Sequence, residues 1–247
     1  MIGILFFIAI LVMNFQSGEK NTDILAEQKE SEVLTPAPSV EEPAPLPEEE
    51  PVAEVFAPAF AYSAVSEEVE KRITNVSWKE GCPVPIEELR YLQVAYWGFD
   101  DQPHMGELIV NKAVAEEVAE IFQELYEAKF PIEKIRLIDE YGAEDKKSMA
   151  DNNTSSFCYR EVEGKPGKLS KHSYGLAIDL NPVQNPYVYK EEISPEAGKD
   201  YTDRSETQKG MILKGDVCYQ AFIDRGWTWG GDWNYEKDYQ HFQKSIK

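Results

Sequence analysis

The hydrophobic positions of this 247-residue chain fall into three zones with different patterns. Residues 2–12 are almost wholly apolar, and residues 19–58 are rich in Glu, Pro and Ala. Ordered patterns begin near Tyr62. An apolar run this short is closer to a signal-peptide core than to the roughly 20 residues that span a bilayer. The pattern therefore predicts a signal peptide or membrane anchor over residues 1–18, a disordered acidic linker over 19–60 and one folded domain over 61–247.

Within the folded part, the spacing of apolar residues predicts two strands followed by an amphipathic helix. Residues 87–99 are rich in aromatic and branched side chains, and residues 107–110 are expected to return as a second strand after a turn. Apolar positions from Val114 to Leu125 recur at helical spacing. Asn111 is expected to cap this helix, which should end near Pro131.

The remaining sequence predicts shorter elements separated by polar segments. A helix is expected at residues 216–225, where Gly226 would end it, and short strands are expected at 135–138, 176–180, 227–229 and 239–242. Residues 145–167 are polar and interrupted by Gly and Pro, so a loop is expected there. The pattern as a whole predicts an α+β domain in which helices cover one side of a small antiparallel sheet.

The charge of the chain argues against one class of partner. The net charge is −20, and from Glu19 to Glu54 eleven acidic residues face only Lys20 and Lys29. Binding to a phosphate backbone needs a basic face, so nucleic acid is not an expected partner. We expect a monomer that contacts a membrane only through its N-terminal segment.

The three cysteines do not indicate a disulfide framework or a cysteine metal site. Cys82, Cys158 and Cys218 are too few for a disulfide scaffold, and none has the Cys-x-x-Cys spacing of a cysteine zinc site. One disulfide is compatible with an exported domain, but the sequence does not select the pair.

Candidate chemistry centres on two of the three histidines of the chain. His172 precedes Asp179 by seven residues, and His241 lies near the C-terminus. Two imidazoles and one carboxylate form a ligand set for a catalytic Zn²⁺ that leaves one position for water, so the metal site is predicted on the sheet that carries Asp179. Asp238, three residues before His241, is placed to act as the general base toward that water. Small residues between the first two ligands would let the backbone pass close to the metal. The alternative is a structural histidine with helix caps, which the scarcity of histidine in this chain makes the weaker interpretation.

The two motifs that carry these residues resemble those of a known family: Ser170-x-His172-x-x-Gly175-x-Ala177-x-Asp179 and Asp238-x-x-His241. The family is that of the D-alanyl-D-alanine carboxypeptidase metallopeptidases, which belongs with the lysostaphin-type peptidases and the zinc domain of hedgehog proteins. The resemblance runs from about Trp78 to Phe242, and the first motif is matched at every fixed position.

The resemblance implies a zinc peptidase that acts outside the cytoplasm, either secreted or anchored at the cell wall. It implies one Zn²⁺ bound by His172, Asp179 and His241, an acid/base carboxylate at Asp238 and a substrate-facing Arg160. The guanidinium of Arg160 would grip a substrate carboxylate or stabilise an oxyanion, whereas the alternative role is a structural ion pair. The implied substrates are peptidoglycan stem peptides, cut by a zinc-activated water as in D,D-carboxypeptidases or L-alanyl-D-glutamate endopeptidases.

The chain departs from the family pattern beside the second histidine. Many relatives have Glu at the position of Asp238 and Trp at the position of Gln240. Branches with Asp include endopeptidases and phage-type lysins, so the bond that is cleaved stays open. A non-catalytic zinc domain that binds the cell wall is an alternative, although it would be expected to lack the acid/base carboxylate. A glycan hydrolase with paired carboxylates has only the abundance of acids in its favour.

Four further residues have candidate roles of lower weight. His104 is expected in a solvated turn, although it could point into the cleft. Trp229 and Trp233 flank a Gly-Gly turn and are candidates either for a cleft wall or for the core. Ser170 is expected to orient the His172 segment or the substrate, and the alternative role is a turn-capping hydroxyl.

Overall fold

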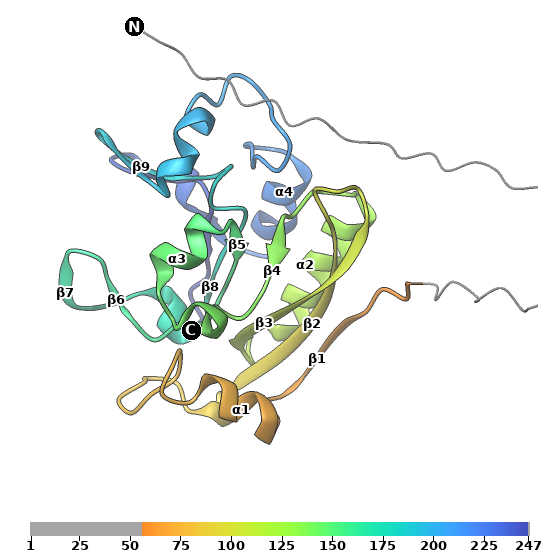
Figure 1. Ribbon diagram of the computed structural model, residues 1–247, viewed down its shortest axis with the longest axis vertical. Helices are drawn as coiled ribbons and strands as arrows, with labels where there is room; N and C mark the ends of the chain where they lie inside the picture. Colours follow the sequence, from red (N-terminus) through yellow and green to blue (C-terminus); the bar gives the residue numbers. More distant parts are fainter. Residues whose placement is uncertain (1–55, 247) are drawn as a thin grey trace, which may run out of the picture. The chain divides into compact units, whose positions relative to one another are not determined.

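Three long strands form an antiparallel sheet in the computed structural model, which describes residues 56–246. The strands β1 (Phe60–Ala64), β2 (Leu89–Trp97) and β3 (Pro103–Asn111) pair in that order, with β2 in the centre (Figure 1). The register places Leu92 opposite Leu108. The two strands predicted around the turn at residue 100 are confirmed, and the second begins earlier than expected. The predicted signal peptide and most of the predicted linker lie outside the described residues.

Helix α2 (Ala115–Glu127) packs on this sheet and contributes to the main hydrophobic core. Val118, Phe122 and Leu125 are almost fully buried, as the helical spacing predicted. The predicted cap is wrong, because the helix begins three residues later with Val114 at its N-cap. Asn111 instead ends β3, where its side-chain Nδ2 donates to the Tyr174 carbonyl at 3.2 Å. This residue therefore ties the large sheet to the segment that carries His172.

A second, smaller antiparallel sheet has the order β11 (Thr228–Trp229), β13 (His241–Gln243), β8 (Ala177–Asp179). It shares its core with α2 and with α4 (Val217–Ile223), and Phe222 of α4 stacks on Phe242 at 4.0 Å between ring centroids. Asp216 caps α4 through a hydrogen bond from the Tyr219 amide, and the helix ends shortly before Gly226, as predicted. The predicted strand at 239–242 begins only at His241.

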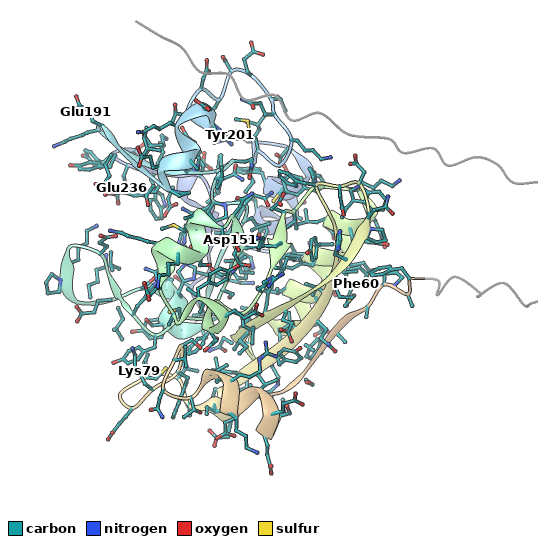
Figure 2. The ribbon with its side chains drawn as sticks, viewed as in Figure 1. Phe60, Lys79, Asp151, Glu191, Tyr201 and Glu236 are labelled. Atoms are coloured by element: carbon teal, nitrogen blue, oxygen red, sulfur yellow. The ribbon has the colours of Figure 1, made fainter. Side chains whose placement is uncertain are left out.

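A third sheet projects beside the second and has the order β10 (Glu192–Ser194), β9 (Tyr187–Tyr189), β12 (Lys237–Asp238). Figure 2 shows Glu191, in the turn between β9 and β10, and Glu236, just before β12, away from the edge of the molecule where Phe60 lies. The predicted α+β class is confirmed, with its strands divided among several small sheets rather than gathered in one.

The segment predicted as a loop, residues 145–167, contains regular structure. It holds α3 (Asp145–Ala150), β5 (Asn153–Thr154) and the hairpin of β6 (Glu161–Val162) with β7 (Lys165–Leu169). Strand β5 pairs in parallel with β4 (Lys134–Ile135). The strand expected at 135–138 is therefore present as β4, but it is shorter than predicted and begins one residue earlier. Buried polar groups hold this region, because Asn153 Nδ2 donates to Ser148 Oγ at 3.0 Å and to the Arg136 carbonyl at 3.1 Å. A hydrophobic pattern does not reveal such a polar core.

The remaining helices are short. They are α1 (Glu67–Ile73) and the 3₁₀ helices η1 (Ile86–Glu88), η2 (Ile138–Tyr141), η3 (Lys171–Tyr174), η4 (Glu196–Tyr201) and η5 (Gly230–Asp232). Among residues 56–246, no helix has both the length and the apolar composition needed to cross a bilayer.

Candidate metal centre

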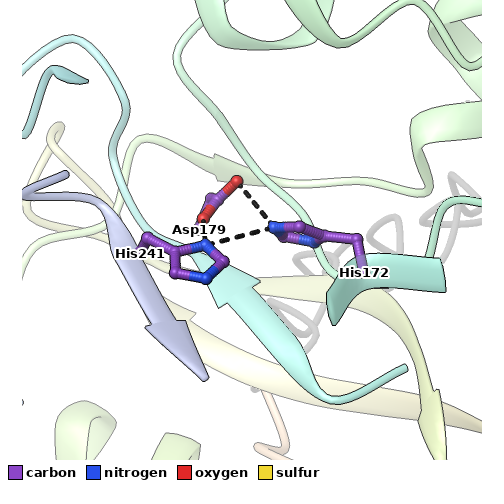
Figure 3. A group of neighbouring side chains, drawn as sticks. All are labelled: His172, Asp179 and His241. Atoms are coloured by element: carbon purple, nitrogen blue, oxygen red, sulfur yellow. Dashed lines mark hydrogen bonds and ion pairs between the residues drawn. The ribbon is translucent and has the colours of Figure 1, made fainter. Parts of the chain in front are cut away.

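The second sheet and the 3₁₀ helix η3 bring His172, Asp179 and His241 together (Figure 3). Asp179 ends β8 and His241 begins β13, and the antiparallel register places these two residues directly opposite each other. Neighbouring side chains across such a pair lie about 4.5–5.5 Å apart at Cβ. His172 comes from η3, where Ser170 Oγ accepts a hydrogen bond from the His172 amide at 3.3 Å. Ser170 is thus the N-cap of η3, which is the turn-capping role that the sequence left as the alternative.

The glycine of the first motif has a different role from the one predicted. Gly175 follows η3 with a left-handed φ of +64°, a conformation that side chains disfavour. A Cβ atom there would lie 2.5 Å from the backbone nitrogen of Asn111. The small residue is thus explained by close contact with the large sheet, which fixes the position of the His172 segment.

The three side chains present their donor atoms to one another. Nε2 of His172 lies 3.0 Å from Asp179 Oδ2, and Nδ1 of His241 lies 2.8 Å from Asp179 Oδ1. The two imidazole nitrogens are 3.3 Å apart. A tetrahedral Zn²⁺ with bonds of about 2.0–2.1 Å separates its ligand atoms by about 3.3 Å. The imidazole separation fits that ion, and small movements of the carboxylate would complete the set.

Two outer contacts select which nitrogen of each histidine faces inward. Nδ1 of His172 lies 2.5 Å from the Ser156 carbonyl, and Nε2 of His241 lies 3.2 Å from Gln243 Oε1. Each oxygen accepts from an N–H, so the opposite nitrogen is left free to bind a cation. Sequence reasoning missed Ser156 and Gln243. The strand period of two, which puts Gln243 on the same face as His241, is the signal that could have found the latter.

Charge in this group favours a bound cation. Burial alone would raise the pKa of Asp179, but the charges of His172 and His241 hold it well below its usual range. Burial lowers the pKa of His241, whereas the Asp179 carboxylate opposes this and raises it to about 9. The buried carboxylate therefore demands a positive neighbour, which is either a proton on His241 or a metal ion.

The three residues lie in the wall of a cleft of about 960 Å³. The β6–β7 hairpin and the sheet of β9, β10 and β12 also contribute to this wall, together with Trp233. The Trp233 ring lies 5.7 Å from the His241 ring, centroid to centroid. Trp229, in contrast, is 5 % exposed and belongs to the main core. Of the two roles that the sequence left open, Trp233 has that of a cleft wall and Trp229 has that of a core residue.

Asp238 ends β12 and lines the same cleft. Its Oδ1 is buried and has no hydrogen-bond partner in the protein. Burial raises the pKa of Asp238 to about 7, the charge of Asp179 adds to the rise, and His241 opposes it. Gly230 packs closely against Asp238, because a Cβ at Gly230 would lie 2.8 Å from the Asp238 Cβ.

Arg160 also lines the cleft, at the start of the β6–β7 hairpin. One guanidinium nitrogen lies 3.0 Å from Asp145 Oδ2, while its Nε is buried and has no partner. Arg160 therefore has the structural ion pair of the alternative interpretation and still faces the cleft.

The other candidates lie away from the cleft. His104 belongs to β3, where Nε2 contacts Asp100 Oδ1 at 2.9 Å and the ring stacks on Tyr96. The turn predicted for His104 is therefore wrong, and its partly exposed side chain is not among those that line the cleft. Cys82, Cys158 and Cys218 are free thiols.

Part of the chain is similar to a known protein family. Residues 163–244 match a family model described as D-alanyl-D-alanine carboxypeptidase. The match covers His172, Asp179, Asp238 and His241, so the resemblance seen in the motifs is confirmed, over a shorter stretch than the one predicted from about Trp78. Arg160 lies just before the matched segment. No solved structure gives a significant match to the chain.

Proposed function

We propose that the protein is a zinc-dependent peptidase of the D-alanyl-D-alanine carboxypeptidase type that acts on peptidoglycan stem peptides. One observation carries the proposal. A buried His–Asp–His group faces a large cleft within the segment that matches the family model. In this proposal His172, Asp179 and His241 hold one Zn²⁺.

The two histidines and the aspartate suit a zinc ion that hydrolyses peptide bonds. Two neutral imidazole nitrogens and one carboxylate are a common ligand set for catalytic zinc, and they leave a position open. When bound, zinc would polarise the scissile carbonyl and lower the pKa of water to about 7. The outer contacts from Ser156 and Gln243 hold each imidazole in the tautomer that this binding requires.

Asp238 supplies the proton transfer in this proposal. Its unpartnered Oδ1 is an acceptor in the cleft that also holds the metal ligands. A carboxylate with a pKa near the working pH takes a proton from water and returns it to the leaving nitrogen with little loss in either direction. In the metal-free protein, burial raises the pKa of Asp238 to about 7, a shift toward this match.

Arg160 positions the substrate. Its Nε is a donor without a partner, and its contact with Asp145 holds the guanidinium plane at the cleft. Such a donor would bind a substrate carbonyl or carboxylate, and it would stabilise negative charge that develops on the scissile oxygen.

The type of peptide bond that is cleaved is also part of the proposal. D,D-carboxypeptidase action is the first assignment, with L-alanyl-D-glutamate endopeptidase action as the alternative of the same family. A non-catalytic wall-binding zinc domain is less favoured, because Asp238 lies in the cleft with an unpartnered acceptor. We also propose that the domain works outside the cytoplasm as a monomer, held by the predicted N-terminal anchor and linker or secreted after cleavage.

Mass spectrometry of digested stem peptides tests the proposal. Zinc-loaded protein is incubated with stem peptides released from cell wall, and the products are weighed. Loss of a terminal D-Ala identifies a carboxypeptidase, whereas new amino termini on D-Glu identify the endopeptidase. Asp238→Asn should keep its zinc and lose about 10²–10⁴-fold in rate. Asp232→Asn, an aspartate paired with Lys214 outside the cleft wall, is the matched control. Unchanged peptides with zinc-loaded wild type would overturn the proposal.

A further inference from the structure

Most residues that carry a buried polar side-chain atom without a partner line the cleft. Within residues 56–246, the buried side-chain nitrogen and oxygen atoms that lack a hydrogen bond are Arg160 Nε, Arg204 Nε, Asp238 Oδ1 and Gln240 Oε1. All of these residues except Arg204 line the cleft. Folded proteins pair about nine in ten of their buried polar groups. Because these unpaired polar groups belong to residues of one cleft, we expect a bound ligand to supply their missing hydrogen-bond partners.

Gln240 is the member of this set that the metal site and the proposed mechanism do not use. It is 2 % exposed, and its backbone is fixed because its carbonyl accepts from the Leu180 amide at 3.0 Å. Its side-chain Nε2 lies 3.6 Å from the thioether of Met149, a weak acceptor, and a contact between the Gln240 side chain and the Asp238 carboxyl lowers the pKa of that carboxyl. The Oε1 of Gln240 has no partner. A buried amide in this state destabilises the free protein, and an apolar side chain of similar size would not. Fold stability therefore gives no reason for an amide at this position.

The position of Gln240 relates it to the substrate. It lies between Asp238 and His241 in sequence and in the same cleft wall. Two unpartnered acceptors, Asp238 Oδ1 and Gln240 Oε1, come from this short segment. A hydrogen-bond acceptor that has no donor in the protein favours a ligand that supplies an N–H group. A peptide chain carries a backbone N–H at nearly every residue.

We infer that Gln240 is a specificity-determining residue whose Oε1 accepts a hydrogen bond from a backbone N–H beside the scissile peptide group. This inference rests on the proposed peptidase function and adds a requirement on the substrate, namely a second, non-scissile peptide N–H. A site built to bind an N–H rejects an analogue that lacks it, because the acceptor then stays buried and unpaired.

A chemical double-mutant cycle tests the inference. The probes are a synthetic stem pentapeptide that ends in D-Ala-D-Ala and a series of analogues, each with one non-scissile backbone N–H replaced by an ester oxygen. Zinc-loaded wild type, Gln240→Met and Gln240→Glu are compared by kcat/KM. Binding of the same probes is measured with each of these side chains combined with Asp238→Asn, so that the ligand is not consumed. Met matches the volume of Gln without its amide, and Glu keeps an acceptor oxygen. Gln240→Leu serves as a second apolar variant, and thermal unfolding checks each fold.

In wild type, one ester position should lower kcat/KM and affinity by about 10-fold or more, as expected when a buried acceptor loses its donor. The same ester should cost less than about 3-fold in Gln240→Met, and Gln240→Glu should restore the sensitivity. Equal losses in wild type and Gln240→Met, or no loss at any position, would overturn the inference. Absence of binding by any probe would overturn it as well. Absence of cleavage alone would instead contradict the proposed peptidase function, because the binding comparison still reports on Gln240.

Discussion

The Nε2–H of His241 donates to the side-chain oxygen of Gln243 at 3.2 Å, two residues further along β13. This contact leaves Nδ1 of His241 directed at Asp179 and at Nε2 of His172. The carboxamide of Gln243 therefore sets the tautomer and the ring orientation on which the proposed ligand set depends.

Replacing Gln243 with Leu should weaken zinc binding without removing a ligand. Loss of an outer hydrogen bond to a ligating histidine typically lowers metal affinity about 10–100-fold. The measurement is competition with a chelator of known affinity. Gln220→Leu, on α4 and bonded only to Asp224, is the matched control and should bind zinc like wild type. Equal affinities for wild type and Gln243→Leu would show that the contact does not orient His241.

Zinc affinity should rise with pH across the neutral range. In the metal-free protein the pKa of His241 is raised to about 9, so this imidazole carries a proton that zinc must displace. Below that pKa, each pH unit should change the apparent Kd about tenfold, with tighter binding at higher pH. Chelator competition at several pH values gives the slope, and calorimetry in buffers of different ionisation enthalpy counts the proton released. His104→Gln should keep the wild-type slope, because His104 lies outside the cleft wall. An affinity independent of pH would contradict this assignment.

Gly230→Ala should reduce peptidase activity by more than its loss of folding stability can explain. The new Cβ would lie 2.5 Å from the Asp238 carbonyl oxygen and 2.8 Å from its Cβ, so the Gly230 backbone or Asp238 must shift, and a shift of Asp238 would carry its carboxylate with it. Overpacking of this kind costs about 1–3 kcal/mol, and a displacement of about 1 Å in a catalytic group can cost 10²-fold in rate. Gly142→Ala is the control, because its left-handed φ of +66° carries a penalty of about 1–2 kcal/mol but open space surrounds it. Both variants should melt earlier, and only Gly230→Ala should lose activity at a temperature where both are folded. Equal activity in the two variants would count against a fixed Asp238.

The ion pair of Arg72 with Glu107 should stabilise the domain in a pH-dependent manner. The two guanidinium nitrogens donate to the two carboxylate oxygens at 3.0 and 2.6 Å, and Tyr91 donates to the same carboxylate. Arg72 is the main cause that lowers the pKa of Glu107 below its ordinary value of 4.5. The stabilisation is therefore complete above that value and is lost as the pH falls through the lowered pKa.

Glu107→Gln should accordingly lower the free energy of unfolding by about 1 kcal/mol at neutral pH, a modest figure because both partners are partly exposed. The difference should shrink as the pH falls below about 4, where the wild-type carboxylate takes up its proton. Denaturant unfolding at several pH values gives both numbers. Glu163→Gln, which breaks a far more exposed pair with Lys146, should change nothing measurable. A constant difference at all pH values would contradict the ion-pair account.

The ligand residues could be predicted from sequence because their chemistry is rare in this chain. Only three histidines occur, and two of them lie in motifs with fixed spacing to a carboxylate. The amphipathic helix over 115–127 and the strands around residue 100 were also predictable, because their apolar periodicity reports directly on a buried face.

What the sequence did not reveal depends on tertiary contacts between polar groups. Asn153 and Ser148 stabilise the 145–167 segment with buried hydrogen bonds that leave no hydrophobic pattern. The reason for Gly175 is the nearby backbone of Asn111, which is 64 residues away in sequence. The contacts of Ser156 and Gln243 with the histidines likewise exist only once the second sheet has formed.

The central claim is that one zinc ion held by His172, Asp179 and His241 is required for peptide cleavage. Its most direct test is the rate of stem-pentapeptide cleavage as zinc is titrated into protein first stripped with a chelator. The account predicts no cleavage before addition, a linear rise and saturation at one equivalent, with no recovery at that ratio for His172→Ala. Cleavage that survives chelation at the full rate, or that ignores added zinc in a folded protein, would contradict it.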